Sequence, residues 1–548
     1  MSTPDDAALT GDLSDLSALV DRVPEGWSPV VYRDRRYGMS RTTHAAGRSV
    51  EIYAEELSGP DVVSTNVLRT SRGDLLRPCE MPAATVLAFL RGWAPHHDSD
   101  PRSTLAAMTQ APPAAPSSAL LTDQYELTML QAALASGTAD RQCTFEVFAR
   151  RLPNGRRYGV VAGTGRLLDA LDEFTFGDAE LARLEPILDS RTLHHLAGYR
   201  FDGDIDGYPE GELFFPGSPV LSITGTFASA VLLETLALSV FNHDCAVASA
   251  AARMASSAGD RTLIEMGSRR AHEQAAVACA RAAYLAGFDT TSNLEAGRRY
   301  GIPTGGTAAH SFTLLHDSEV EAFTAQVASL GTSTTLLVDT YDITKGIEAA
   351  IKVAGNTLGA IRIDSGDLGV LARAARDQLD ALGAKHTRIV LSGDLDEYGI
   401  AALRAEPVDA YGVGTSVVTG SGAPTAGMVY KLVEVDGRPV EKRSENKASM
   451  GGRKSAFRRH KPTGTATEEV VHLHGDEPDI GVHDTVLPIP LVRAGSVVPG
   501  LPDLMRSRDH LKQRLVSLPW EGLKLSQGDP AIPTVFQLPG HPSLREPR

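Results

Sequence analysis

Between about residues 261 and 435, short runs of β-branched and other apolar residues alternate with longer alanine-rich segments of helical spacing. The helical segments include RRAHEQAAVACARAAYLA at 269 and LGVLARAARDQLDALG at 368. Such alternation predicts βα units built around a parallel sheet. Eight or so strand-like runs within roughly 175 residues fit a compact (β/α) barrel better than an open sheet. They begin at residues 261, 287, 302, 333, 359, 387, 409 and 427.

The amino-terminal part of the chain has a different pattern. Short alternating runs at 28–40 and 48–57 precede an apolar helical run at 82–93, which predicts a small α+β module over residues 1–93. Residues 94–118 are dominated by Pro, Ala and Ser without an amphipathic period, and we predict a linker there. We interpret the module as an accessory domain because it has no convergent polar groups. The alternative is that translation starts at Met108.

Composition limits the classes of function. The chain has 548 residues, of which 42% are hydrophobic and 22% charged, and its formal net charge is −15. That balance argues against a nucleic-acid partner, since phosphates require a basic surface. The acidic, polar start does not predict a signal peptide, and no uninterrupted apolar run of about 18 residues occurs that would predict a membrane span. We therefore expect a cytoplasmic protein.

The cysteines add to this expectation. Cys79, Cys143, Cys245 and Cys279 lie far apart, and no CxxC pair occurs. A disulfide framework or a zinc site is therefore not expected, and buried reduced thiols fit the spacing best.

Polar residues gather where nearly every predicted barrel strand ends. In a barrel these ends converge on one mouth, where catalytic groups are found, whereas any single Asp after a strand would be an ordinary turn residue. Repetition across the strands favours the mouth. The residues are Arg269, Asn293, His310, Asp342, Asp364, Asp367, Asp394 and Thr415.

Three strand ends have residues suited to small anionic ligands. Arg362 and Asp364 alternate in IRIDSGD. They form either a structural ion pair or a ligand site, because arginine fits a carboxylate and a carboxylate suits sugar hydroxyls or hydrated Mg²⁺. The VLSGD and GVGTSV segments offer backbone amides of Gly393, Gly414 and Thr415 for a phosphate.

Further candidates stand alone in the sequence. Arg269 and Arg270 in EMGSRRAHE are either a solvated pair or positive charge for a polyphosphate. Tyr125, in the first turn of a predicted helix, either packs on the core or offers a flat platform for a ring substrate. His310 in GGTAAHSF is flanked by small residues and has no second ligand at metal spacing. It is either a core histidine or a nucleophile with space around its ring.

Taken together and in order, these segments resemble the nicotinate phosphoribosyltransferase family, from about Leu120 to the carboxyl-terminal region. The resemblance implies an incomplete (β/α) barrel over residues 256–429 and an open α/β sandwich domain over 119–255 and 430–548, in addition to the small α+β module. The segments are TDQYELTM, FEVFARRLPNGRRYGVVAG, LLETLALSVFN, EMGSRRA, GGTAAHSF, VDTYDITKGI, IRIDSGDL, LSGDLDE, GVGTSVVT and GRKSAFR.

The resemblance also implies a reaction. Nicotinate displaces pyrophosphate from 5-phosphoribosyl 1-diphosphate to give nicotinate mononucleotide, the first step from nicotinate to NAD. ATP hydrolysis to ADP and phosphate is coupled through a phosphohistidine, which would be His310. Mg²⁺ would accompany the polyphosphates, and a homodimer with shared active sites is implied.

Site residues carry over from the family by position. Nicotinate contacts are implied for Tyr125, Thr307 and Arg362, with Tyr125 reaching across the dimer interface. Metal ligands are not assigned. Phosphoribosyl diphosphate contacts are implied for Thr415, Gly414, Gly393, Asp364 and Arg269.

Two departures and two alternatives accompany the resemblance. Gly451 replaces a usual proline, and Arg443 replaces a usual apolar residue. One alternative is a nicotinamide phosphoribosyltransferase, since an arginine can also bind an amide oxygen. The other is a non-catalytic pyridine-nucleotide sensor with the amino-terminal module as its output.

Overall fold

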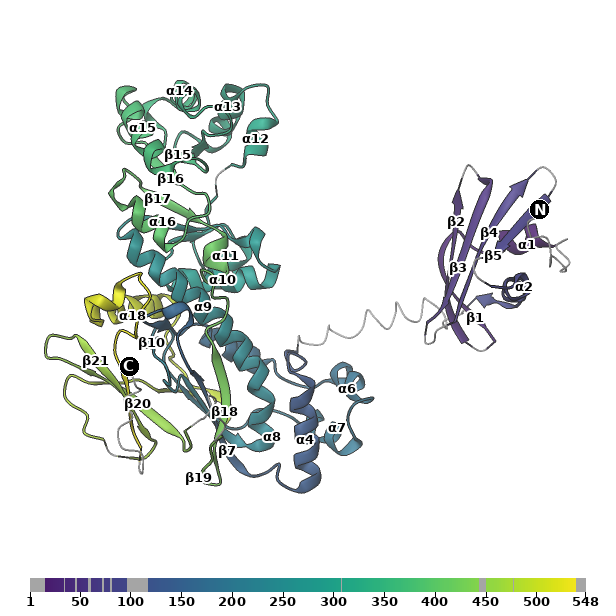
Figure 1. Cartoon of the computed structure of the whole chain (residues 1–548), viewed down its shortest axis with the longest axis horizontal. Coiled ribbons are helices and arrows are strands. Elements are labelled where there is room, and N and C mark those ends of the chain that lie inside the picture. Colours follow the sequence, from purple (N-terminus) through teal and green to yellow (C-terminus); the bar gives the residue numbers. More distant parts are fainter. Residues whose placement is uncertain are drawn as a thin grey trace, which may run out of the picture. The chain divides into compact units, whose positions relative to one another are not determined.

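The structure, a computed structural model, describes residues 15–33, 35–44, 47–57, 61–70, 73–78, 81–95, 117–306, 308–442, 450–476 and 478–538. The chain divides into two compact units, Met1–Ala114 and Ala115–Arg548 (Figure 1). Most of the predicted linker lies outside the described residues, as do Cys79, Thr307 and Arg443.

The first unit is a small α+β module built on one antiparallel sheet with strand order β5-β4-β3-β2-β1-β6. Burial alternates along the strands: in β3, Val50, Ile52 and Ala54 are buried and the residues between them face outward. This is the pattern of a sheet with one solvated face. Its elements are α1 (Leu16–Asp21), β1 (Gly26–Tyr32), β2 (Arg35–His44), β3 (Ser49–Glu56), β4 (Val62–Thr70), β5 (Gly73–Pro78), α2 (Ala83–Gly92) and β6 (Ala94–Pro95).

The second unit contains the predicted parallel sheet, but with six strands rather than eight. Their order is β13-β12-β17-β16-β15-β14, and every neighbouring pair is parallel. No pairing between β13 and β14 closes the ring among the described residues, so the barrel is incomplete. The strands are β12 (Thr262–Glu265), β13 (Thr290–Thr291), β14 (Thr335–Leu337), β15 (Ala360–Ile363), β16 (Arg388–Leu391) and β17 (Ala410–Val413).

The prediction of eight barrel strands was wrong for two runs. The run at 302 forms only an isolated bridge between Thr291 and Thr304, at the open edge of the sheet. The run at 427 becomes β18 (Met428–Val435) and pairs antiparallel with β7 (Gln142–Ala149) in another sheet. Burial in β18 alternates approximately every second residue, which suits a half-exposed antiparallel strand and not a parallel strand buried on both faces.

Helices connect the barrel strands, as the alternating pattern predicts. One α-helix each connects β12 to β13, β14 to β15, β15 to β16 and β16 to β17. The longest crossover, from β13 to β14, contains three α-helices and the segment that leads to His310, and α17 follows the last strand. The helices are α10 (Glu273–Leu285), α11 (Leu294–Tyr300), α12 (His310–Leu314), α13 (Glu319–Leu330), α14 (Ile343–Ala354), α15 (Leu368–Ala381), α16 (Glu397–Ala402) and α17 (Thr415–Val418).

The rest of the second unit is built from a seven-stranded sheet, β19-β18-β7-β11-β9-β23-β24, a four-stranded sheet, β22-β20-β21-β25, and the pair β10-β8. Their strands are β8 (Gly159–Val160), β9 (Asp204–Gly207), β10 (Leu213–Phe214), β11 (Leu221–Thr226), β19 (Arg438–Pro439), β20 (Lys454–His460), β21 (Ala466–Leu473), β22 (Thr485–Val486), β23 (Ile489–Arg493), β24 (Ser496–Val497) and β25 (Thr534–Gln537). The helices here are α4 (Gln124–Ser136), α5 (Thr164–Asp172), α6 (Asp178–Leu184), α7 (Ser190–Ala197), α8 (Phe227–Ala230), α9 (Glu234–Ala258) and α18 (Leu504–Ser517).

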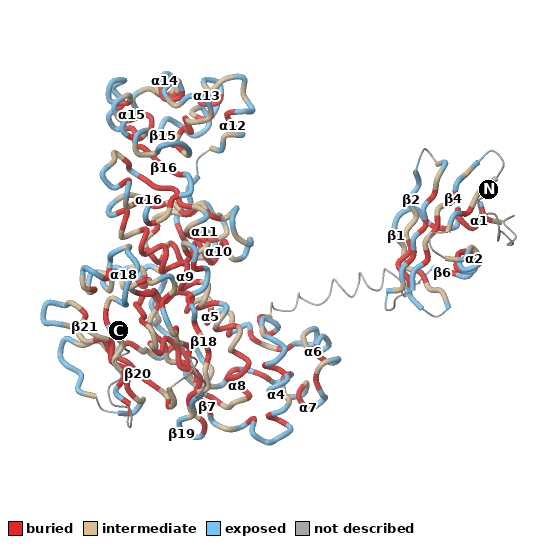
Figure 2. The backbone as a smooth tube through the Cα atoms, viewed as in Figure 1, coloured by how far each residue is buried: buried red, intermediate tan, exposed pale blue. Residues whose placement is uncertain are grey.

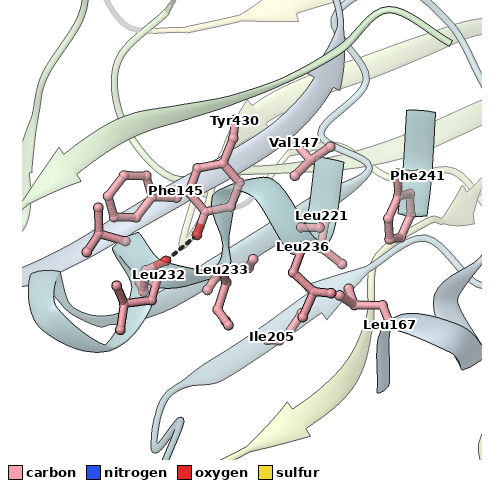
Figure 3. Packing of buried hydrophobic residues seen from close by; sticks show 14 of the residues in the cluster. Phe145, Val147, Leu167, Ile205, Leu221, Leu232, Leu233, Leu236, Phe241 and Tyr430 are labelled. Atoms are coloured by element: carbon pink, nitrogen blue, oxygen red, sulfur yellow. Dashed lines mark hydrogen bonds between the residues drawn. The ribbon is translucent and has the colours of Figure 1, made fainter. Parts of the chain in front are cut away.

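Helix α9 packs against both parts of this unit and is buried along most of its length (Figure 2). On the side of the seven-stranded sheet, Phe145 stacks on Tyr430, whose hydroxyl donates a 2.7 Å hydrogen bond to the carbonyl of Ala230 (Figure 3). Among the described residues, one helical stretch, Phe227–Ala258, is long and apolar enough to cross a membrane, and 67% of its apolar part is buried inside the protein. Burial of that extent is typical of a core helix. The fold class is confirmed: an incomplete barrel stands beside additional sheets in an α/β unit.

Candidate active site

The carboxyl ends of β12, β15, β16 and β17 enclose a pocket of about 220 Å³. It brings together six of the nine residues predicted for the site. Two larger hollows of about 510 Å³ lie away from these strand ends, one of them near the amino end of β12. The pocket is lined by Met266, Arg269, Arg270, Arg362, Asp364, Ser392, Gly393, Asp394, Gly412, Gly414 and Thr415.

Arg362 and Asp364 form an ion pair, which was one of the two possibilities that the sequence left open, and Ser392 is hydrogen-bonded to both side chains. The Arg362 guanidinium donates from Nη2 to Asp364 Oδ1 at 2.8 Å and from Nε to Ser392 Oγ at 2.7 Å. Ser392 Oγ in turn donates to Asp364 Oδ1. Burial alone would raise the pKa of the Asp364 carboxyl, but Ser392, Arg362 and His310 together hold that pKa below its ordinary value. Asp364 is therefore ionised at neutral pH.

The arginines after β12 are the open cationic groups of the pocket. Arg269 and Arg270 lie in a short 3-10 turn, Ser268–Arg270, and both are exposed. Neither guanidinium has a hydrogen-bond or ion-pair partner within the described part of the chain. Gly267 begins this turn, and a Cβ there would collide with the Val418 side chain. Only glycine lets the turn pack this closely against the segment after β17.

The loop after β16 brings backbone close to the Asp364 end of β15. Gly393 has φ of 112°, and a Cβ at this position would collide with the carbonyl oxygen of Asp364. Asp394 follows with φ of 48°, in the left-handed region that aspartate tolerates better than most residues. Such backbone conformations are common at ligand sites. Gly414 and Thr415 stand on the next strand end, where Gly414 is the N-cap of α17.

His310 is the first residue of α12 and does not line the pocket, but it lies close enough to Asp364 to contribute to the lowered pKa of that carboxyl. Its side chain is 40% exposed, Nδ1 lies 3.2 Å from Thr340 Oγ1, and Nε2 lies 3.9 Å from Asp339 Oδ1. Asp339 is 1% exposed. Its Oδ2 accepts from the Asp364 amide at 2.8 Å and from Ser365 Oγ at 2.9 Å, but Oδ1 has no hydrogen-bond partner among the described residues. Asp339 thus connects the histidine to the end of β15.

Sequence reasoning missed Asp339 and Ser392. Asp339 comes two residues after β14, and its position at the start of DTYD was the available signal, but Asp342 was the predicted candidate in that segment. Asp342 caps α14, accepting from the Lys345 amide at 2.9 Å. Asn293 and Asp367 likewise cap α11 and α15. The ordinary turn interpretation was therefore correct for these three strand ends.

Tyr125 does not line the pocket, and Thr307 lies outside the described residues. Tyr125 is on α4 in the other part of the unit and is 44% exposed. Its pKa is raised to about 12 by partial burial and by the neighbouring carboxylates of Glu234 and Glu126.

Comparison with known proteins decides the family. A family model described as the N-terminal domain of nicotinate phosphoribosyltransferase matches residues 120–242. Nicotinate phosphoribosyltransferase pncB1 of Mycobacterium tuberculosis is 65% identical to this chain over 423 residues, covering 76% of the chain and 94% of the relative. The chain belongs to the nicotinate phosphoribosyltransferase family. The nicotinate phosphoribosyltransferase of Bacillus subtilis is 38% identical over 357 residues, covering 62% of this chain and 72% of the relative.

Solved structures of the family agree with the fold. The crystal structure of human nicotinic acid phosphoribosyltransferase matches with a TM-score of 0.66 and 27% identity, covering 76% of this chain and 97% of the human chain. The nicotinate-nucleotide pyrophosphorylase of Pyrococcus furiosus has the same fold, with a TM-score of 0.61 and 24% identity over 77% of this chain and 98% of that one. As a member of the nicotinate phosphoribosyltransferase family, the chain is an enzyme whose pocket stands at the mouth of an incomplete barrel.

Proposed function

We propose that this enzyme forms nicotinate mononucleotide from nicotinate and 5-phosphoribosyl 1-diphosphate, coupled to ATP hydrolysis through a phosphohistidine at His310. One observation carries the proposal. A single pocket combines the cationic side chains of Arg269 and Arg270, backbone that a ligand can approach closely and the Arg362 guanidinium, and His310 lies beside this pocket.

The three cysteines within the described residues, Cys143, Cys245 and Cys279, are free and buried. Their state supports the reducing cytoplasm as its compartment.

The phosphoribosyl diphosphate is proposed to bind along the arginine turn and the two glycine-containing strand ends. Arg269 and Arg270 supply positive charge that no protein carboxylate neutralises among the described residues. Gly414 and Thr415 present backbone amides and a hydroxyl for the 5-phosphate. Gly393 lets the backbone of the loop after β16 approach Asp364 closely. Cationic groups fixed in advance would also stabilise the negative charge that builds up on the departing pyrophosphate.

Nicotinate is proposed to lie with its carboxylate toward Arg362. Ser392 and Asp364 hold two of the guanidinium nitrogens, so the planar group is oriented before substrate arrives and loses little freedom on binding. Thr307 is proposed as a further contact to nicotinate. Asp364 is then available to a ribose hydroxyl, because it is ionised and 34% exposed.

His310 is proposed to accept the γ-phosphoryl group of ATP on a ring nitrogen. The Nε2–Pγ bond forms as the bond from Pγ to the ADP oxygen breaks, and water later cleaves the phosphohistidine to release phosphate. The doubly charged group beside Asp364 and Asp339 changes the local electrostatics and can reorder the site. ATP energy would thereby become tighter productive binding of the other substrates.

Mg²⁺ is proposed to enter with the polyphosphates. Among the described residues, no group of three or more His, Cys, Asp or Glu side chains could hold a metal ion. Mg²⁺ ordinarily needs only one or two carboxylates besides phosphate oxygens and water. Asp364 and Asp394 line the pocket and meet that requirement. The bound ion would neutralise phosphate charge.

The pyridine ring is proposed to stack on Tyr125 of a second copy of the chain. Leu121, Tyr125 and Met129 are spaced four residues apart on or just before α4, and they are 61%, 44% and 38% exposed. This spacing gives one apolar stripe on a helix, which supports an interface between copies. A homodimer would then share its active sites.

Mixing two variants that lack nicotinate-stimulated ATP hydrolysis tests this sharing. Tyr125→Ala and His310→Ala homodimers are each expected to lack that stimulation. After subunits exchange at equal amounts, half of the dimers carry one intact site of two, so about a quarter of the wild-type stimulated hydrolysis should return. Mixtures that stay inactive, with exchange verified by differently tagged chains, would place Tyr125 at its own subunit's site or at none.

The substrate assignment is tested by steady-state assays with nicotinate and nicotinamide, each with phosphoribosyl diphosphate and with or without ATP. We expect nicotinate mononucleotide, pyrophosphate and stimulated ATP hydrolysis. Better turnover of nicotinamide would identify the enzyme as an amide-specific relative, and no turnover of either substrate would favour a non-catalytic sensor.

Replacing Asp339 by asparagine tests the residue behind His310. The amide oxygen can still accept from the Asp364 amide and Ser365, so the fold should persist, but the negative charge beside His310 is lost. Transfer of phosphoryl to His310 is expected to slow about 100-fold, the lower end of what positioned acid–base partners contribute. Rapid-quench measurement with labelled ATP gives that rate. Asp342→Asn, which replaces one good helix cap with another, should leave it unchanged; an unchanged rate in Asp339→Asn would remove Asp339 from the mechanism.

A further inference from the structure

Glu265, the last residue of β12, is a buried carboxyl that does not line the pocket. It is 1% exposed, and no ion pair engages it among the described residues. Its Oε1 accepts a 2.5 Å hydrogen bond from the amide of Gly267, which begins the arginine turn. Its Oε2 accepts a 2.5 Å hydrogen bond from Thr291 Oγ1 on β13. The two carboxylate oxygens thus hold two different strand ends.

Thr291 extends this connection toward His310. Its amide donates to the Pro303 carbonyl at 3.1 Å, and its carbonyl accepts from the Gly305 amide at 3.0 Å. These bonds fix the start of the segment that ends at His310, at the edge where the barrel is open. The Thr291 side chain therefore joins Glu265 to the only sheet-like pairing that this segment makes in the described structure.

A second link runs parallel to the first. Thr291 Oγ1 accepts from the Asn293 amide at 3.0 Å, and the Asn293 side chain donates from Nδ2 to Ser268 Oγ at 3.0 Å. Ser268 belongs to the arginine turn. Gly267, Ser268, Thr291 and Asn293 thus form a chain of hydrogen bonds around Glu265, with the phosphate-binding arginines on one side and the histidine segment on the other.

We propose that Glu265 is a positioning residue that couples His310 to the arginine turn, through Thr291 on one side and Gly267 on the other. It touches no substrate. When His310 gains or loses its phosphoryl group, a movement of Pro303 and Gly305 is transmitted through Thr291 and Glu265 to Arg269 and Arg270. The coupling follows from two oxygens of one rigid group holding both segments. This inference rests on the proposed function.

A purely structural role would not require a carboxyl here. Burial raises the pKa of Glu265, while the hydrogen bonds from Thr291 and Gly267 oppose that rise. When ionised, a buried acid without a cationic partner costs stability, whereas an apolar residue of similar size would fill the space without that cost. A buried polar group with all its hydrogen bonds made instead fixes one arrangement of the residues around it.

The test uses Thr291→Val, which removes the hydroxyl but keeps the side-chain shape, and Thr291→Ser, which keeps the hydroxyl. Glu265→Ala is the second disrupting variant. Each full-length protein is assayed for the moles of nicotinate mononucleotide formed per mole of ATP hydrolysed, and for the KM of phosphoribosyl diphosphate. The ratio does not depend on the fraction of protein that is folded, so mere destabilisation would not change it.

We expect Thr291→Val and Glu265→Ala to lower the product-to-ATP ratio about fivefold, the lower end of coupling between sites, and to raise the KM of phosphoribosyl diphosphate. Thr291→Ser should retain the wild-type ratio. If Glu265→Ala does not fold, Thr291→Val decides. Wild-type ratios and KM in the disrupting variants would overturn the coupling. A wild-type enzyme that forms no nicotinate mononucleotide would instead overturn the proposed function.

Discussion

Replacing His310 by alanine is expected to abolish nicotinate-stimulated ATP hydrolysis while leaving the fold intact. The imidazole is partly exposed at the start of α12, and its polar side-chain contacts among the described residues are to Thr340 and Asp339. Its removal therefore opens no cavity in the core, and stability should change by less than about 0.5 kcal/mol. Without a ring nitrogen, no phosphoryl acceptor is present.

The measurement is phosphate release with and without nicotinate and phosphoribosyl diphosphate, together with circular dichroism to verify folding. Some synthesis of nicotinate mononucleotide without ATP coupling is compatible with the mechanism, because His310 is not among the residues proposed to bind nicotinate. His386→Ala, at an exposed position after α15, serves as the matched control. ATP hydrolysis that stays fully stimulated in His310→Ala would remove this residue from the mechanism.

The second large effect is expected at Arg362. Arg362→Gln removes the positive charge and the planar fork, so kcat/KM for nicotinate should fall about 100-fold or more, in the range measured when one member of a buried charged pair is truncated. Arg362→Lys keeps the charge but loses the fork and should be impaired as well. Turnover of nicotinamide should fall less, because an amide has no charge to pair.

The control for Arg362 is Arg388→Gln, an exposed arginine at the amino end of β16 on the same sheet. It should behave as wild type. Equal losses for nicotinate and nicotinamide in Arg362→Gln would show that Arg362 only orders Asp364 and Ser392. An unchanged kcat/KM for nicotinate would contradict the proposed carboxylate site.

The sequence was sufficient to predict the barrel but not the number of its strands. Alternating strands and alanine-rich helices predicted βα units, and six of the eight predicted strands form the sheet. The run at 302 contains Pro303 and two glycines, which limit ladder bonding, so it contributes one bridge only. The run at 427 has the composition of a barrel strand, and only its alternating burial indicates an antiparallel partner, which begins with Met428 opposite Ala149 in β7.

The positions of six candidate site residues were predictable, because each position depends only on the strand end to which the residue belongs. Arg362, Asp364, Gly393, Gly414, Thr415 and Arg269 meet because parallel strands end at one edge of a sheet. Asp339 and Ser392 were missed because their roles depend on contacts to residues 25 and 28 positions away. Conversely, three other strand-end residues have similar amide or carboxylate side chains, but these side chains cap the helices that follow them; the residues are Asn293, Asp342 and Asp367. Residue type and position alone do not separate these cases.

The central claim, that ATP energy passes through His310, is tested most directly by phosphopeptide mapping of the wild-type enzyme after incubation with labelled ATP. We predict acid-labile, base-stable phosphate on the peptide that contains His310, lost again when nicotinate and phosphoribosyl diphosphate are added. Stimulated ATP hydrolysis with no phosphate on that peptide, or with phosphate on another residue, would contradict the claim.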